Sequence, residues 1–168
     1  MDAKVGTLTR DEIPEQSKWD LSGLYSTNED WDKDLIALEA DLSGYASFHG
    51  TLSQSFLKLR ECIDFDMNFS RRIEKLYTFA HLKNDEDKTN NFYQKNFEKV
   101  MRLISEANSA SSFIRPEIME IPQEKIAEFI KEEGMEFYKF YLEQILRYRD
   151  HTLTEKEEKL LAASGEIG

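Results

Sequence analysis

Histidine, cysteine and carboxylate side chains are the groups of this sequence that could do chemistry, and their spacing decides what they can do. His49, His81 and His151 are far apart in the chain, and no two of them stand four residues apart, as a zinc site on one helix face requires. His81 with Asp85, and His151 with Glu155, have the i, i+4 spacing of a surface hydrogen bond on a helix. We therefore expect no metal-binding or catalytic role for the histidines.

Cys62 and Asp66 both fall on the apolar side of a long predicted helix. A thiol in that position behaves as a small buried hydrophobe, and a single cysteine cannot form an internal disulfide. A buried carboxylate needs a hydrogen-bond partner or stays protonated. Asp66 is therefore predicted to accept a hydrogen bond from a tyrosine or to pair with an arginine or lysine of the next helix, and a functional carboxylate is the alternative.

Asp85, Asp87 and Thr89 occupy positions one, three and five of a possible calcium loop. Position six needs a glycine for the sharp turn and is Asn90, whereas position twelve needs a bidentate glutamate and is Asn96. We interpret this segment as a solvated turn between two helices that also caps the second helix. The sequence thus predicts no catalytic, cofactor-binding or metal-binding residue, and it identifies no substrate-binding one.

The elements that would position these residues are helices, because apolar residues recur at helical spacing along most of the chain. The expected helices are residues 28–44 after the N-cap Thr27, a long segment from Ser53 to about His81, residues 92–107, residues 123–132 before Gly134, and a segment that turns Phe137, Tyr138, Tyr141, Leu142, Ile145 and Tyr148 inward. Pro116 and Pro122 are expected to bracket a short turn. Thr154 and Glu157 form a capping box that opens a last helix.

This pattern predicts an all-α fold, an antiparallel helical bundle built on a long helical hairpin. Residues 1–26 are expected to form an extended N-terminal arm, and residues 27–168 a helical domain. Trp19, Leu21, Leu24 and Tyr25 are packed too closely for a solvated tail. We expect them to be buried against the helices.

Charge and hydropathy exclude several classes of partner. The chain carries 33 acidic and 22 basic residues, and the formal charge of -11 repels nucleic acid and anionic membranes. No apolar run approaches the ~20 residues that a membrane span needs. No N-terminal stretch has the pattern of a signal peptide. We therefore expect a cytoplasmic location, with neither nucleic acid nor a membrane as a partner.

Five ordered blocks of sequence resemble one family. "RDEIP" with "KWDLSGLY" near the start, "LYTFAHLKNDEDKTNNFYQ" (76–94), "SFIRPEIMEIP" (112–122) and "YLEQILRYRDHTLTEKEEKLLAASGE" (141–166) are similar to oligoendopeptidase F. That enzyme is a branch of the thimet-oligopeptidase-type zinc metallopeptidases. The resemblance covers nearly all of the chain from about Arg10.

The resemblance implies a zinc-dependent enzyme that hydrolyses short peptides, in which His-Glu-x-x-His and a later glutamate hold the metal. This sequence contains no such motif, so no catalytic or zinc-binding residue can be assigned, and we expect the chain to be inactive by itself. The family reading makes it the N-terminal helical domain of a larger peptidase that continues past Gly168, forms one wall of the substrate channel, and has the downstream catalytic domain and short peptides as partners.

An alternative reading is a free-standing helical module that binds a protein or peptide in an apolar groove. If the chain stands without its catalytic domain, Leu160, Leu161 and the inner side of the hairpin would be left uncovered. Such a face favours pairing with a second copy of the chain.

Overall fold

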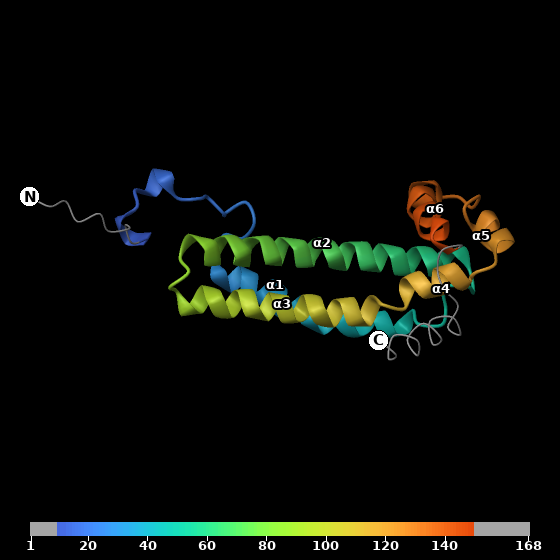
Figure 1. Ribbon diagram of the computed structural model, residues 1–168, viewed down its shortest axis with the longest axis horizontal. Helices are drawn as coiled ribbons and strands as arrows, with labels where there is room; N and C mark the ends of the chain where they lie inside the picture. The colour runs from blue at the N-terminus through green and yellow to red at the C-terminus, as the bar shows by residue number, and fades with distance from the viewer. Residues whose placement is uncertain (1–9, 150–168) are drawn as a thin grey trace, which may run out of the picture. The chain divides into compact units, whose positions relative to one another are not determined.

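The computed structural model describes residues 10–149, which consist of helices and turns without a strand (Figure 1). The chain divides into two compact units. Within the described range the first unit comprises residues 10–47 and 64–111, and the second comprises residues 48–63 and 112–149. The predicted all-α class is confirmed. The last predicted helix, with His151, Thr154, Leu160 and Leu161, lies outside the described residues.

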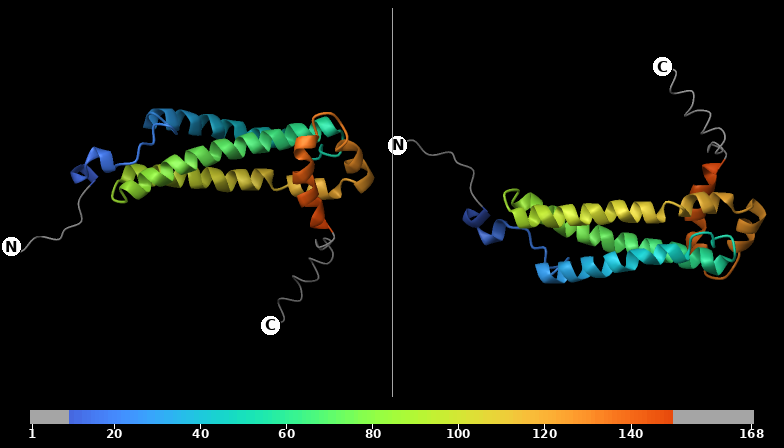
Figure 2. Two further views of the ribbon diagram at one scale, coloured as in Figure 1. Left: turned by 90° about the horizontal axis from the view of Figure 1, so that it is seen from above. Right: turned by 90° about the horizontal axis from the view of Figure 1, so that it is seen from below.

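The first unit is built from three helices that run side by side (Figure 2): α1 (Asn28–Asp41), residues 64–86 of α2 (Phe56–Glu86), and α3 (Asn91–Ser111). Thr27 caps α1 as predicted, because its Oγ1 accepts a hydrogen bond from the backbone N–H of Asp30 at 3.1 Å. Residues 87–90 join α2 to α3, which confirms the predicted hairpin. The core of this unit comprises Trp31, Leu35, Leu38, Tyr45, Leu76, Ala80, Val100 and Leu103.

The second unit combines the start of α2 with three short helices: α4 (Ile114–Glu120), α5 (Gln123–Phe129) and α6 (Lys139–Arg147), the last preceded by a 3₁₀ turn (Glu136–Tyr138). Gly134 has a φ of +85°, a conformation that suits glycine, but α5 ends at Phe129 with Ile130 as its C-cap, so the prediction that Gly134 ends this helix is wrong. Arg149 Nη2 donates to the Ile121 carbonyl at 2.8 Å, near the end of α4. The core comprises Leu52, Leu59, Cys62, Ile114, Ile118, Ile126, Met135 and Leu142.

Several predicted boundaries are wrong. α2 ends at Glu86 rather than at about His81, and α5 ends at Phe129 rather than at Glu132. Ser55 rather than Ser53 precedes the start of α2, and its Oγ accepts a hydrogen bond from the Lys58 N–H at 3.2 Å. Residues 116–122 do not form only a turn, because α4 contains Pro116 as its third residue. The first four N–H groups of a helix have no acceptor within the helix, so a proline costs little there.

The N-terminal arm covers the helices only in part. Tyr25 is buried as predicted, and Leu21 and Leu24 are half-buried, but the Trp19 side chain is 53% exposed. The prediction that Trp19 is buried is therefore wrong. The arm contains two short 3₁₀ turns, at Arg10–Glu12 and Glu15–Ser17, so its path is not extended throughout.

Candidate functional site

Asp66 has the partner that its position on the helix predicted. The Tyr45 hydroxyl donates to Asp66 Oδ1 at 2.8 Å, and both residues belong to the first unit. The Tyr45 ring packs edge-on against Phe65 and Phe69, with centroids 4.9 and 5.3 Å away. The carboxylate is half-buried. These contacts give Asp66 the structural role of anchoring Tyr45 to α2.

The histidines of the described chain have separate surroundings. His81 Nδ1 lies 3.1 Å from Asp85 Oδ2, without the angle of a hydrogen bond, and its ring packs between Tyr77 and Phe97. His49 belongs to the second unit, where its ring lies 5.0 Å from that of Phe113. Between residues 10 and 149, neither histidine belongs to a group of three histidine, cysteine, aspartate or glutamate side chains that could hold a metal ion.

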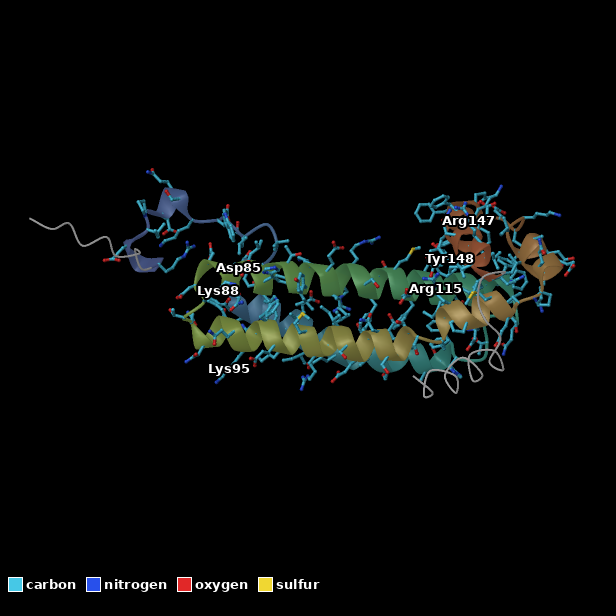
Figure 3. All side chains as sticks on the ribbon, viewed as in Figure 1. Asp85, Lys88, Lys95, Arg115, Arg147 and Tyr148 are labelled. Atoms are coloured by element: carbon cyan, nitrogen blue, oxygen red, sulfur yellow. The ribbon has the colours of Figure 1, made fainter. Side chains whose placement is uncertain are left out.

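The turn at residues 87–90 satisfies its own backbone. Asp87 Oδ1 accepts hydrogen bonds from the backbone N–H and the hydroxyl of Thr89, and Asn90 Oδ1 accepts one from the Phe92 N–H at the start of α3. Asp85 still lies within α2, where a hydrogen bond from Lys88 lowers the pKa of its carboxyl (Figure 3). The segment therefore has the predicted geometry of a turn that caps the next helix.

A cluster of charges that the sequence did not single out joins the end of the arm to α1 and α2. The Tyr25 hydroxyl donates to Asp34 Oδ2 at 2.6 Å, and the Arg72 guanidinium donates to Asp34 at 2.7 Å and to Asp41 at 2.6 Å. Burial, together with the hydrogen bond to Asp34, raises the pKa of Tyr25 above its ordinary value. Burial also favours protonation of Asp34, but the hydrogen bonds from Tyr25 and Arg72 outweigh it and lower the pKa of Asp34.

This cluster stabilises the fold and has no free group for catalysis. Asp34 and Asp41 both pair with Arg72, and the phenol of Tyr25 is held protonated by its surroundings. The sequence signal for it was weak, because Asp34 and Arg72 are separated by 38 residues and only the packing of α1 on α2 brings them together. Long-range pairs of this kind cannot be read from spacing.

The zinc site that the family resemblance implies has no counterpart in the described part of the chain. Between residues 10 and 149, no group of three histidine, cysteine, aspartate or glutamate side chains is close enough to hold a metal ion. Cys62 is fully buried in the second unit, where a thiol packs as a small hydrophobe. These residues do not fit zinc, and we derive no catalytic step from them.

Residues of each unit line a pocket. The pocket of the second unit, about 560 Å³, lies beside α4 and is lined by His49, Gly50, Ser53, Phe113, Pro116, Glu117, Glu120, Ile121 and Pro122. Glu117 is already engaged there, since its Oε1 accepts a hydrogen bond from the Gly50 N–H at 2.6 Å. The pocket of the first unit, about 440 Å³, lies between the arm and the hairpin, with Trp19, Phe79 and Tyr93 among its walls. Neither pocket contains a nucleophile held by a general base.

Three aromatic side chains in and beside α6 are exposed: Phe137 in the preceding 3₁₀ turn, Phe140 in α6, and Tyr148 at its C-cap. Phe137 is 80% exposed, Phe140 71% and Tyr148 55%, so the prediction that Phe137 and Tyr148 face inward is wrong. Tyr138, Leu142 and Ile145 are buried as predicted. The exposed rings have the same helical spacing as core residues, and spacing alone does not say which side of a helix packs inside. We call Phe137, Phe140 and Tyr148 the α6 aromatic face.

Among the helices between residues 10 and 149, none combines the length and the hydropathy that a bilayer span requires.

Comparison with known proteins identifies relatives of one kind. Residues 117–168 match the family model Peptidase_M3_N, described as oligopeptidase F. The chain is 33% identical over 159 residues to oligopeptidase PepF of Bacillus subtilis, which is 94% of this chain and 24% of that protein. It is 31% identical to the group B oligopeptidase PepB of Streptococcus agalactiae, again over 94% of this chain and over 26% of that protein.

Comparison with solved structures identifies relatives of the same kind. A Chlamydophila abortus protein assigned as a peptidase superposes with a TM-score of 0.83 at 28% identity, over 93% of this chain and 27% of that one. Oligoendopeptidase-F from Enterococcus faecium superposes with a TM-score of 0.69 at 33% identity, over 84% of this chain and 28% of that one. The chain thus spans about a quarter of the length of these relatives. In sequence and in fold, the chain is similar to the N-terminal part of oligoendopeptidase F-type peptidases.

Proposed function

We propose that this chain is the non-catalytic N-terminal helical domain of a zinc-dependent oligopeptidase that hydrolyses short peptides. One observation carries the proposal: 159 residues align with only a quarter of oligopeptidase PepF. The 168 residues include no His-Glu-x-x-His motif, so the zinc and the catalytic groups would belong to the remaining three quarters of such an enzyme.

The role of the domain in that enzyme is to form one wall of the substrate channel. A wall can select substrates by size only if it keeps its shape. Bonds between the helices of the first unit support this role. A buried hydrogen bond joins α1 to α2, from Trp31 Nε1 to the Leu76 carbonyl at 2.9 Å, and the Arg72 guanidinium of α2 binds Asp34 of α1 at 2.7 Å. A rigid wall admits short flexible peptides and excludes folded proteins.

The proposed role also implies partners and a location for the chain. The partners are the catalytic domain and, through the whole enzyme, short peptides. The charge of -11 opposes binding to nucleic acid or anionic membranes. Cys62, which is buried and the only cysteine, is consistent with a cytoplasmic location.

A free-standing binding module is the second candidate. The observation that favours it is the exposed α6 aromatic face, since exposed aromatic residues are typical of protein interaction sites. In that case the chain would bind a protein or peptide partner without any peptidase.

The experiment that separates the two candidates is a reconstitution assay. The chain is tested against an internally quenched short peptide with added zinc, alone and then mixed with the separately expressed remainder of Bacillus subtilis oligopeptidase PepF. Activity that appears only in the mixture supports the proposed domain role. A mixture that stays silent, although the remainder is folded and loaded with zinc, supports the binding module.

A further inference from the structure

The exposed side of α6 is chemically unlike an ordinary solvent-facing helix surface. At 100° per residue, Phe140, Gln144 and Arg147 fall within an arc of about 60° on one side of α6, and Leu142 and Ile145, which are buried, fall on the other side. Phe137 in the preceding 3₁₀ turn and Tyr148 at the C-cap of α6 are exposed as well. A helix that is apolar on two sides is normally covered on both, so the side with the phenylalanines lacks a cover.

Two arginines border this side. Arg147 follows Phe140 by seven residues on the same arc of α6, and the Arg115 guanidinium of α4 lies over the Tyr148 ring, 5.6 Å from its centroid (Figure 3). Both arginines are exposed. On a chain of net charge -11, this surface combines aromatic rings with local positive charge. Aromatic residues and arginine are the types enriched where proteins bind one another.

The charges limit what can cover the α6 aromatic face. A second copy of the chain, related by a two-fold axis through this face, would gather two copies each of Arg147 and Arg115 at one interface, which the repulsion of like charges opposes. A nucleic acid or an anionic membrane would be repelled by the chain as a whole. A polypeptide with an apolar surface flanked by carboxylates fits both the rings and the arginines.

The relatives have further polypeptide that could supply this surface, because this chain matches only 24% of oligopeptidase PepF. We propose that the α6 aromatic face, with Arg147 and Arg115, is the surface on which the catalytic part of the enzyme docks, through an apolar patch against Phe137 and Phe140 and carboxylates opposite the two arginines. This inference rests on the proposed function, since it names the surface through which the domain would join its catalytic partner.

The test measures how tightly the chain binds the remainder of Bacillus subtilis oligopeptidase PepF, by calorimetric titration and by the chain concentration that restores half-maximal peptidase activity. The variant Phe137→Ser/Phe140→Ser removes both rings, and Arg147→Glu reverses a border charge. Ile36→Ser is the matched control, because Ile36 is 65% exposed on α1 in the first unit. We expect the double variant to raise the apparent Kd about tenfold or more, as loss of buried aromatic anchors does.

For Arg147→Glu we expect weaker binding and a smaller loss of affinity on adding salt, since an attractive charge contact is replaced by a repulsive one. Ile36→Ser should bind like the wild type. If the α6 variants bind as well as the Ile36 control, the docking inference is overturned while the proposed function stands. If the wild-type chain neither binds the remainder nor restores activity, both the inference and the proposed function fail.

The same variants distinguish two other occupants. Melting temperatures of the isolated variants should match that of the wild type, because the two rings are exposed; a drop specific to the double variant would mean that the chain itself covers the face and would overturn the inference. Sedimentation should show that the wild-type chain stays monomeric at the concentrations of the titration. A dimer that the double variant dissociates would make a second copy the occupant and would likewise overturn the inference.

Discussion

The indole of Trp31 donates a hydrogen bond from Nε1 to the backbone carbonyl of Leu76 at 2.9 Å, inside the core of the first unit. Trp31 is on α1 and fully buried, and Leu76 is on α2 and fully buried. A large apolar ring and a directional bond therefore act together at one helix contact. The other tryptophan, Trp19, is 53% exposed and provides a natural comparison.

Trp31→Ala is expected to lower the free energy of unfolding by about 3 to 5 kcal/mol, because it empties a buried site and leaves the indole's bond unmade. Trp19→Ala should change it by less than about 1 kcal/mol, since surface substitutions away from special features have small effects. Urea denaturation measures the unfolding free energies of both variants and checks the two expectations. Equal destabilisation by the two substitutions would contradict the burial of Trp31 and the exposure of Trp19.

Gly44→Ala is expected to cost about 1 to 3 kcal/mol, because an added Cβ would stand 2.7 Å from Cζ of Phe65. That ring cannot move freely, since it packs against Tyr45 at 4.9 Å and Phe69 at 6.0 Å. Gly23→Ala is the control, because a Cβ added at Gly23 would meet nothing within 4 Å. Thermal melting of the two alanine variants checks this packing, and a Gly44 variant as stable as the Gly23 variant would refute it.

Acid should weaken the cluster that joins Tyr25, Asp34 and Arg72. The pKa of Asp34 is lowered in the folded chain, so the folded state favours the carboxylate. Its contribution is present above the pKa of an unfolded aspartate, about 3.9, and is lost as the pH falls through the lower folded value. Asp34→Asn should therefore be less stable than the wild type at pH 7, and the difference should shrink as the pH falls from about 5 to about 3.

Unfolding free energies of the wild type and Asp34→Asn across that pH range provide the measurement. Asp32→Asn is a suitable comparison, because Asp32 forms an ion pair with Lys99 at the surface and surface pairs contribute little. A stability difference for Asp34→Asn that stays constant from neutral pH down to about pH 3 would show that the charge of Asp34 does not stabilise the fold.

Zinc should not bind the isolated chain in a one-to-one ratio. The sequence has three histidines and one cysteine, and within residues 10–149 these do not gather with carboxylates into a set of three. Metal analysis after dialysis against zinc, with the remainder of Bacillus subtilis oligopeptidase PepF as the positive control, checks this expectation. One tightly held zinc per chain would contradict it.

Helix positions could be predicted from the sequence where a residue's local chemistry determines where a helix starts. Thr27 marked the start of α1 because a threonine oxygen can satisfy an unpaired N–H of the first turn. Gly134 did not mark the end of α5, because its positive φ belongs to the turn after the helix, which ends at Phe129. The segment around Pro116 was mistaken for a turn, because a proline inside the first turn of a helix looks like a breaker unless its position in that helix is known.

Burial was harder to predict than helix positions, since it depends on what surrounds each face. Phe137 and Tyr148 have core spacing, yet they are exposed in this chain. The prediction for Asp66 succeeded for a physical reason: a carboxylate on a mostly apolar face needs a donor, and Tyr45 supplies it. The bond from Arg72 to Asp34 could not be foreseen, because no local rule links residues 38 positions apart.

A chimera tests the central claim most directly. This chain replaces the matched quarter of Bacillus subtilis oligopeptidase PepF, and the product is assayed for zinc content and for cleavage of an internally quenched short peptide and of a folded protein. The account predicts a folded enzyme that carries zinc, cleaves the peptide and leaves the folded protein intact. A chimera that folds and carries zinc but cannot cleave the peptide would contradict the claim that this chain is the N-terminal domain of an oligopeptidase.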